Sequence, residues 1–304
     1  MKSANYIKRT KAGTVFDVLN VTILILMSFL FVYPFWNQLV VSFNDGIDAA
    51  RGGLYFWPRE FTLGNYTYIF QTAGMLDALG WSLARVVVGT VTKLVATGLL
   101  AYVTTVKHFS FHSKLRKMFL ITMYVSGGMI PTYLAFIKLG LLETFTVYWL
   151  PSILSAYEMM IIASYIESLP DALFESARID GAKEITIYAK ICLPLCVPVF
   201  AALGVMVAVG HWNSWFDVIL YNPSGKYDTL QIVLRNILIQ SDKIKKLMSD
   251  ATVGSAAVKS AAARISTVSM RAATMMVVTI PIVLVYPFFQ KYFVKGISIG
   301  AVKG

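Results

Sequence analysis

The chain has 304 residues, of which 57% are hydrophobic and only 14% are charged, and its mean hydropathy is +0.65. Soluble domains carry about 25% charged residues, so this composition excludes an ordinary soluble domain and indicates a polytopic membrane protein. The 27 Lys and Arg residues outnumber the 16 Asp and Glu residues, which gives a net charge of +11. The basic residues cluster beside apolar stretches, where cytoplasmic loops and anionic lipid account for them, so nucleic acid is not an expected partner.

Apolar segments recur along the chain at a length that can cross a bilayer, which takes roughly 20 residues each. We expect an all-α membrane protein with six transmembrane helices in one domain over residues 1–304. The spans are predicted at about 15–41, 76–106, 115–139, 145–166, 191–220 and 272–293. Prolines inside several of them permit kinks. The first apolar run is too long for a signal peptide, so we expect it to be retained.

Basic residues indicate which connections lie in the cytoplasm, because short loops rich in Lys and Arg stay on that side. Such groups precede the first span, separate the second from the third, lie between the fourth and fifth, and follow the last span. With six spans, this pattern places both termini and segment 168–190 in the cytoplasm, and segment 221–271 outside. The basic groups comprise Lys2, Lys8, Arg9, Lys11, Lys107, Lys114, Arg116, Lys117, Arg178, Lys183, Lys190, Lys291, Lys295 and Lys303.

Segment 168–190 is predicted to form two short helices that meet at a glycine. Pro170 suits the first position of a helix, and Asp171 lies in the first turn. Asp180 and Gly181 then indicate a helix end, since glycine adopts the left-handed conformation required there. We therefore expect a compact helical turn in water between two apolar spans.

The same segment carries a spaced motif. Glu175, Ser176 and Ala177 are followed after three residues by Gly181, and after nine more by Ile191, Leu193 and Pro194. This pattern resembles the EAA loop of ABC importer permeases, and only Ser176 departs from it, where the family usually has alanine. The alternative is that this segment is an ordinary loop between two helices, without a docking role.

The resemblance extends over nearly the whole chain. The stretches 127–131, 139–142, 211–216 and 286–293 and the tail 299–304 look like carbohydrate permeases of the maltose type, and most like their LplC/YtcP-like group. This resemblance implies a type I ABC importer permease in the inner or plasma membrane of a bacterium. It implies import of a carbohydrate, with an oligosaccharide as the expected substrate.

The coupling loop is assigned from this resemblance. It implies that Glu175 pairs with a basic residue of an ATPase, while Ala177 and Gly181 permit a close approach. Leu173 and Phe174 would supply apolar contact. The alternative for Glu175 is a solvated helix charge. The expected ATPase-coupling residues are Leu173, Phe174, Glu175, Ser176, Ala177, Asp180 and Gly181.

The chain shows no ATP site of its own. The phosphate-binding pattern G-x-x-x-x-G-K-[ST] is absent; Gly225 and Lys226 come closest, but Tyr227 follows them. Energy must therefore come from other chains. The resemblance implies two ATPase subunits that bind ATP and Mg, a second, related permease, and an extracellular binding protein. The chain itself is expected to bind no cofactor and to catalyse no reaction.

Two charged residues lie near the middle of predicted spans. Lys93 falls in the second span and Glu158 in the fourth. Charges inside a membrane are costly and are candidates for a substrate or ion path. Alternatively, the two side chains pair with each other, or Lys93 extends its stem toward the interface. Arg85 is nearer the outer end, where a structural role is expected.

A polar and aromatic group lies late in the fifth span. Trp212 and Trp215 can stack on sugar C–H surfaces, and the amide of Asn213 can bind hydroxyls, which makes all three substrate-path candidates. Tryptophan also concentrates at membrane interfaces for purely physical reasons, so Asn213 is the strongest of the three.

No metal site is predicted. His108 and His112 are four residues apart, a spacing that can bind metal in a helix. No carboxylate or cysteine accompanies them in their short basic loop, so solvated histidines are expected. Cys192 and Cys196 are expected to be small core residues.

The long outer segment 221–271 contains a predicted amphipathic helix over 228–240. Apolar residues repeat there at i, i+3, i+4, i+7 and i+8, with Gln231, Arg235 and Asn236 toward water. This helix either packs on a protein partner, with the binding protein as the expected one, or lies in the outer leaflet. The stretch 251–263 has no clear apolar face.

A rival function remains open at this point. An ion-coupled secondary transporter would use Lys93 and Glu158 as its coupling pair. The inverted repeats typical of such proteins are not apparent, and the 168–190 turn would have no purpose in one. Co-purifying ATPases would distinguish the two functions.

Overall fold

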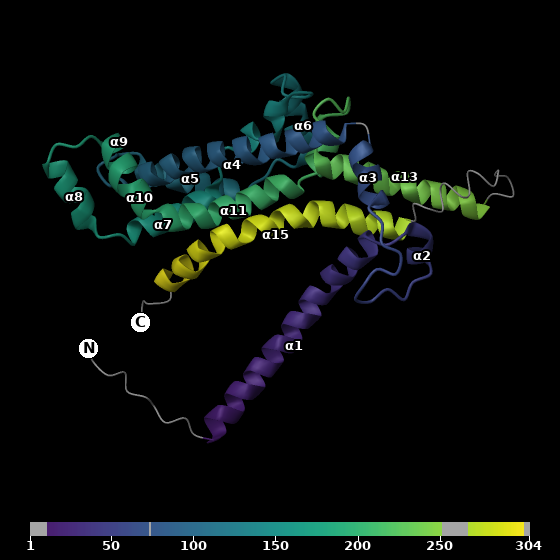
Figure 1. Ribbon diagram of the computed structural model, residues 1–304. Helices are drawn as coiled ribbons and strands as arrows, with labels where there is room; N and C mark the ends of the chain where they lie inside the picture. Colours follow the sequence, from purple (N-terminus) through teal and green to yellow (C-terminus); the bar gives the residue numbers. More distant parts are fainter. Residues whose placement is uncertain (1–10, 73, 251–266, 301–304) are drawn as a thin grey trace. The chain divides into compact units, whose positions relative to one another are not determined.

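The computed structural model describes residues 11–72, 74–250 and 267–300, and these residues are almost entirely helical (Figure 1). Within them the structure contains one isolated antiparallel bridge, between Asn44 and Phe61. The predicted stretch 251–263 and several of the terminal basic residues lie outside the described residues. The all-helical class expected from the apolar periodicity is confirmed.

Three helices are individually long and apolar enough to cross a membrane. These are α1 (Lys11–Ser42), α4 (Met75–Thr105) and α15 (Thr267–Gly300), which cover the spans predicted at 15–41, 76–106 and 272–293. Most large apolar side chains along α1 are exposed, as expected for a helix whose solvent is lipid.

The other three predicted spans are broken rather than continuous. Helices α5 (His112–Tyr124) and α6 (Met129–Lys138) meet at 119°. Two 3-10 turns (Phe145–Tyr148 and Leu150–Ser152) precede α7 (Ala156–Glu167), with a bend of 47°. The helical run Glu184–Leu195 meets α11 (Val197–Asn213) at 77°. If each bent pair is one span, the described residues supply up to six spans.

Local sequence explains these breaks. Gly128 adopts φ +83°, a conformation that favours glycine, and it separates α5 from α6. Pro151 lies in the second 3-10 turn, where it cannot donate a helical hydrogen bond. Pro194 and Pro198 flank the bend before α11. Prolines, which the sequence analysis expected to permit kinks, thus lie at two of the three breaks, and the predicted spans 115–139, 145–166 and 191–220 are interrupted helices.

The segment 168–190 folds as predicted into two short helices. Helix α8 (Asp171–Ile179) ends at Gly181, whose φ of +77° is the left-handed conformation expected there. Helix α9 (Glu184–Ile187) follows, then a π-helical turn (Tyr188–Cys192) and α10 (Leu193–Leu195). Asp171 lies in the first turn of α8 and Pro170 directly precedes that helix, one position earlier than the sequence suggested.

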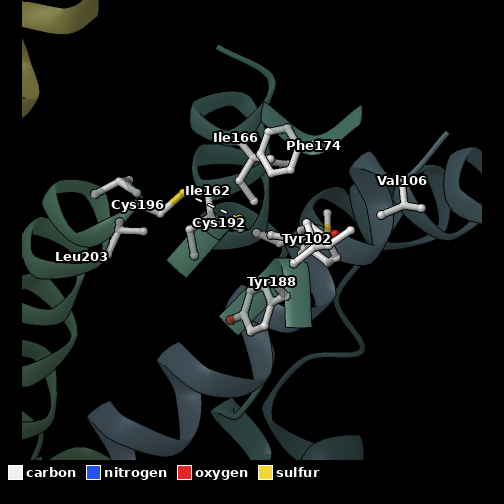
Figure 2. Close-up of a cluster of buried hydrophobic side chains, with 14 of the residues drawn as sticks. Tyr102, Val106, Ile162, Ile166, Phe174, Tyr188, Cys192, Cys196 and Leu203 are labelled. Atoms are coloured by element: carbon white, nitrogen blue, oxygen red, sulfur yellow. Dashed lines mark hydrogen bonds between the residues drawn. The ribbon is translucent and has the colours of Figure 1, made fainter. Parts of the chain in front are cut away.

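The chain forms two compact units, one built mainly on α1 to α3 and the other on α4 to α12, with α13 and α15 contributing to both. The core of the second unit joins α4, α7, α8 and α11 (Figure 2). Ile162, Ile187 and Cys192 are completely buried in this core. Cys192 and Cys196 are free and buried, with their sulfur atoms 3.9 Å apart, which agrees with the predicted core role.

Helix α4 packs on α11 where two side chains of α11 lie directly against glycines of α4. A Cβ atom added at Gly98 would overlap the Phe200 ring, and one added at Gly89 would lie 2.5 Å from Nε2 of His211. Overpacking of this kind costs about 1–3 kcal/mol. Helices α4 and α11 therefore touch through two glycines that no larger residue can replace without displacing the neighbour.

In the first unit, residues 42–69 form a small polar assembly that includes α2 (Gly46–Ala50) and α3 (Gly64–Gln71). Asp48 accepts hydrogen bonds from Asn44 Nδ2 at 2.8 Å and from Arg59 Nε at 2.9 Å. These two donors hold the pKa of the Asp48 carboxyl below its usual value. Asn65 Nδ2 donates to the carbonyls of Ser42 and Asn44. The segment is thus held by side-chain hydrogen bonds together with a small apolar cluster that includes Ala49 and Leu54.

Helix α13 (Leu230–Asp250) confirms the helix predicted at 228–240 and extends it. Leu230, Ile232, Leu234 and Ile237 are buried within the protein, and the Leu230 amide donates to Ser82 Oγ at 2.8 Å. The first part of the helix therefore packs on its own chain, so neither a protein partner nor the outer leaflet covers the apolar face of residues 230–237. Gln231 is half-buried, whereas Arg235 and Asn236 are exposed as expected.

Candidate functional site

A cleft of about 600 Å³ with a mixed apolar and charged lining lies within the second unit, formed by parts of α4, α6, α7, α11 and α12 (Phe216–Tyr221) together with the two 3-10 turns. Most of these elements are parts of apolar segments, so the ionisable groups in the cleft cannot be explained as a water-facing surface. Its charged and polar lining includes Arg85, Lys93, Glu158, His211, Ser214 and Asp217.

Lys93 and Glu158 meet in this cleft. The Lys93 Nζ atom lies 3.0 Å from Glu158 Oε1, and the two side chains are 17% and 14% exposed. Glu158 lies in the first turn of α7, whose N-cap Ser155 accepts a hydrogen bond from the Glu158 amide at 3.4 Å. A carboxylate is favoured at this end of a helix. Of the predicted alternatives, pairing is the one observed, and the pair also lines the cleft.

A second ion pair joins Arg85 to Asp217. Both terminal nitrogens of Arg85 donate to the Asp217 carboxylate, and the Arg85 side chain is only 3% exposed. Asp217 Oδ1 also accepts from Ser214 Oγ at 2.7 Å and from the Val218 amide at 3.0 Å. The guanidinium lies 4.8 Å from the centre of the Tyr148 ring. Arg85 is thus held through its two terminal nitrogens and the Tyr148 ring, while its buried Nε has no hydrogen-bond partner among the described residues; these contacts are in keeping with the structural role expected for it.

Sequence reasoning missed two residues of this site. Asp217 is an acid within the predicted span 191–220, the same signal that pointed to Glu158. His211 lies in the same span, and its ring contacts the backbone of α4 at Gly89. Both residues could have been found by treating every ionisable group inside a predicted span alike.

The three other path candidates do not line the cleft. Trp212 is 7% exposed, and its indole Nε1 donates to the Val278 carbonyl at 3.1 Å. Asn213 is exposed at the last position of α11. Trp215 is exposed, with the Arg235 guanidinium 5.1 Å from its ring centre. The structure therefore does not bring these residues together with Lys93 and Glu158.

The residues of the predicted coupling loop divide into two faces. Leu173, Glu175, Ser176, Asp180 and Gly181 are exposed. Phe174 and Ala177 are buried in the core of this chain, where they pack with α4 and α7 (Figure 2). The exposed apolar surface of α8 is therefore formed by Leu173 and Ile179, the latter 85% exposed, and does not include Phe174, which was expected to supply apolar contact.

Among the described residues, no group of three or more His, Cys, Asp and Glu side chains is arranged to hold a metal ion. His112 Nδ1 lies 2.8 Å from the Phe109 carbonyl, and His108 Nε2 lies 3.5 Å from Glu184 Oε1. These contacts account for both loop histidines.

Comparison with known proteins defines the class of this molecule. No family model matches the chain. The chain is 37% identical to Protein LplC of Bacillus subtilis over the full length of both proteins. It is 34% identical to YtcP, the polygalacturonan/rhamnogalacturonan transport system permease protein of the same organism, with 95% of this chain and 98% of YtcP covered. A crystal structure of a bacterial ABC transporter involved in alginate import shares the fold, with a TM-score of 0.80 at 22% identity over 96% of this chain.

These findings identify a transmembrane permease subunit of a bacterial ABC transporter, a non-catalytic component embedded in the membrane through several helices. The chain belongs to the family of carbohydrate importer permeases that includes LplC and YtcP. The resemblance found from the EAA pattern is thus confirmed at the level of the family.

Proposed function

We propose that this protein is one transmembrane subunit of an ATP-driven importer that moves an oligosaccharide across the bacterial membrane. The observation that carries the proposal is the cleft between apolar helices, whose largely apolar lining includes two ion pairs formed inside the chain. Such a cleft can receive hydroxyl-rich molecules without exposing an unpaired charge to lipid. Two relatives indicate the class of substrate. YtcP is a transport system permease protein for polygalacturonan or rhamnogalacturonan. AraQ of Halalkalibacterium halodurans, which is 29% identical to this chain, is one for arabinooligosaccharides.

The proposed topology has six spans, three of them the bent helix pairs. Both termini, the 107–117 loop and the 168–190 turn lie in the cytoplasm. The support is the concentration of Lys and Arg in these short segments. Segments 42–75 and 221–271 then lie outside, where the polar assembly around Asp48 faces water.

In this scheme the 168–190 turn is the docking site for two ATPase subunits, which bind the ATP and Mg that this chain does not. Glu175 accepts a charge-assisted hydrogen bond from a basic ATPase residue. Leu173 and Ile179 provide exposed apolar contact beside it. A second, related permease completes the membrane channel.

An extracellular binding protein delivers the sugar to the outer segments. A second structure of the alginate transporter, in complex with a pentasaccharide-bound periplasmic protein, aligns with 93% of this chain at a TM-score of 0.53. The exposed side chains Arg235 and Asn236 of α13, whose buried face is already occupied, are available for this contact.

Co-purification tests the proposal. An affinity-tagged copy of the chain, expressed with its genomic neighbours, is expected to bring ATPase subunits and a second permease through a mild detergent purification. An ion-coupled transporter using Lys93 and Glu158 would purify without ATPases. Purification of the intact, folded chain alone under conditions that preserve known importers would overturn the proposal.

A further inference from the structure

Glu184 joins three parts of the chain at the end of the bundle that carries α8. Its Oε2 accepts a hydrogen bond from Tyr102 Oη at 2.5 Å, and its Oε1 accepts one from Arg178 Nε at 2.8 Å. His108 Nε2 lies 3.5 Å from the same Oε1. Hydrogen bonding to Glu184 is the main cause that raises the pKa of the Arg178 guanidinium. One carboxylate thus connects the end of α4, the end of α8 and the start of α9.

Helix α4 reaches from this junction to the cleft without a break. It runs as one α-helix over Met75–Thr105. Tyr102, Lys93 and Arg85 all lie on it. At a rise of 1.5 Å per residue, Lys93 and Arg85 are about 14 Å and about 26 Å from Tyr102 along the helix axis. A displacement at Tyr102 is therefore carried along the helix to both ion pairs.

The partners of these two cations belong to other elements. Glu158 is on α7, which leads into α8 through residues 168–170, whereas Asp217 is on α12. Helix α7 is thus joined to the coupling turn by the chain itself. Helix α4 contacts the turn through the hydrogen bond to Glu184 and through buried apolar contacts. The turn is therefore connected to Glu158 along the chain, through α7. It is connected to Lys93 through the hydrogen bond between Glu184 and Tyr102 of α4.

We infer that Glu184 is a positioning residue that transmits movement of the α8 turn to α4, and through α4 to the Lys93–Glu158 pair. The inference rests on the proposed function. It assigns the coupling between ATPase docking and the cleft to Glu184, which lies on α9 and outside the exposed surface of α8 proposed to bind the ATPase. When α8 moves with a docked ATPase, Glu184 carries Tyr102 and the whole of α4 with it. The contacts of α4 with α11 at Gly89 and Gly98 make α11 follow. The ion pairs in the cleft then change their geometry in step with the turn.

A matched pair of variants tests this role. Tyr102→Phe removes the hydroxyl that donates to Glu184. Tyr188→Phe removes a hydroxyl with no hydrogen-bond partner in the part of the chain that the structure describes. The two rings are neighbours, with centroids 5.2 Å apart, and are 4% and 8% exposed (Figure 2). The two substitutions therefore change packing alike and differ in the bond to Glu184.

The readout is the amount of sugar transported per ATP hydrolysed by the complete complex in proteoliposomes. We expect Tyr102→Phe to lower this ratio about tenfold, while the amount of co-purifying ATPase stays within twofold of wild type. Tyr188→Phe is expected to change neither quantity by more than twofold. A purely structural role for Glu184 would lower assembly and transport together and leave the ratio unchanged.

Glu184→Gln adds an independent test, because its amide oxygen still accepts from Tyr102 but its charge no longer holds Arg178. We expect a loss of about threefold in the same ratio, with no further loss when it is combined with Tyr102→Phe beyond that of Tyr102→Phe alone. If wild type imports sugar and both Phe variants keep the wild-type ratio, the role of Glu184 is contradicted and the proposed function stands. If the wild-type chain binds no ATPase, both the role of Glu184 and the proposed function are contradicted.

Discussion

The cleft and the 168–190 turn differ in how their charged side chains are neutralised. In the cleft, each cation meets a carboxylate of the same chain, and the Arg85 side chain is almost fully buried. In the turn, Glu175 and Asp180 are exposed, beside the exposed apolar side chains Leu173 and Ile179. A charge inside the membrane has no water to solvate it, so the chain must neutralise it internally. The turn, by contrast, keeps an unsatisfied surface of mixed chemistry, which is typical of a site that another protein covers.

The largest effect is expected from breaking the more buried ion pair. Arg85→Met leaves Asp217 without its counter-ion in a buried site, and loss of one partner of such a pair costs about 3–5 kcal/mol. We expect the variant to lose most of its yield in detergent-solubilised membranes and to unfold at lower temperature. Arg85→Met combined with Asp217→Leu should recover most of the loss, because no unpaired charge remains. A single variant as stable as wild type would show that the pair is not needed.

The next effect concerns the pair that also lines the cleft. Glu158→Leu should reduce sugar uptake more than tenfold while the complex still assembles, because Lys93 then has no partner at the cleft wall. Glu158→Gln should keep part of the uptake, since its amide still accepts a hydrogen bond. Uptake into proteoliposomes, normalised to assembled complex, measures both. Wild-type uptake by the Leu variant would mean that Glu158 does not contribute to the path.

In the turn, a surface substitution should affect coupling and leave the fold intact. Glu175→Ala is expected to lower ATPase retention about tenfold, with normal membrane insertion. Gly181→Asp should act in the same direction, since its φ of +77° costs about 1–2 kcal/mol for a residue with a side chain. Asp171→Ala, which removes an exposed acid of the same helix paired with Lys107, serves as the control. Equal retention in Glu175→Ala and Asp171→Ala would contradict the docking role.

The smallest effect is expected at Asp48, where a charged cluster lies outside the spans. Its folded pKa lies below its unfolded value near 3.9. The stabilisation it gives is therefore fully present above the unfolded pKa and is lost as the pH falls through the folded pKa. Thermal unfolding of wild type and Asp48→Asn between pH 6 and pH 3 should converge as the pH falls. Parallel curves would show that this carboxylate does not titrate with folding.

The sequence was sufficient for some elements because their signal is local. Helices α1, α4 and α15 follow from long, predominantly apolar runs, and the end of α8 follows from Gly181. Kinks were expected in several spans, but the 119° angle between α5 and α6 and its position at Gly128 were not, because an apolar run does not encode how sharply a span bends.

The candidate site depended on contacts that no local pattern encodes. Lys93 and Glu158 could be singled out because a charge inside a span is rare, and their pairing was one of the alternatives. The Arg85–Asp217 pair joins residues 132 positions apart, so only the packing of α4 against α12 reveals it. Phe174 was predicted to face a partner, but α8 turns that side chain into its own core, and sequence periodicity did not tell which of the two apolar sides would be covered.

The central claim is that this chain carries sugar through a membrane under the control of ATPases docked on α8. Uptake of a labelled oligosaccharide into proteoliposomes tests it most directly. The vesicles contain this chain, the second permease and the ATPases, with the binding protein outside and ATP inside. The account predicts uptake that requires the binding protein and ATP together and that falls at least tenfold with Glu175→Ala. Uptake driven by an ion gradient in the absence of ATP would contradict it.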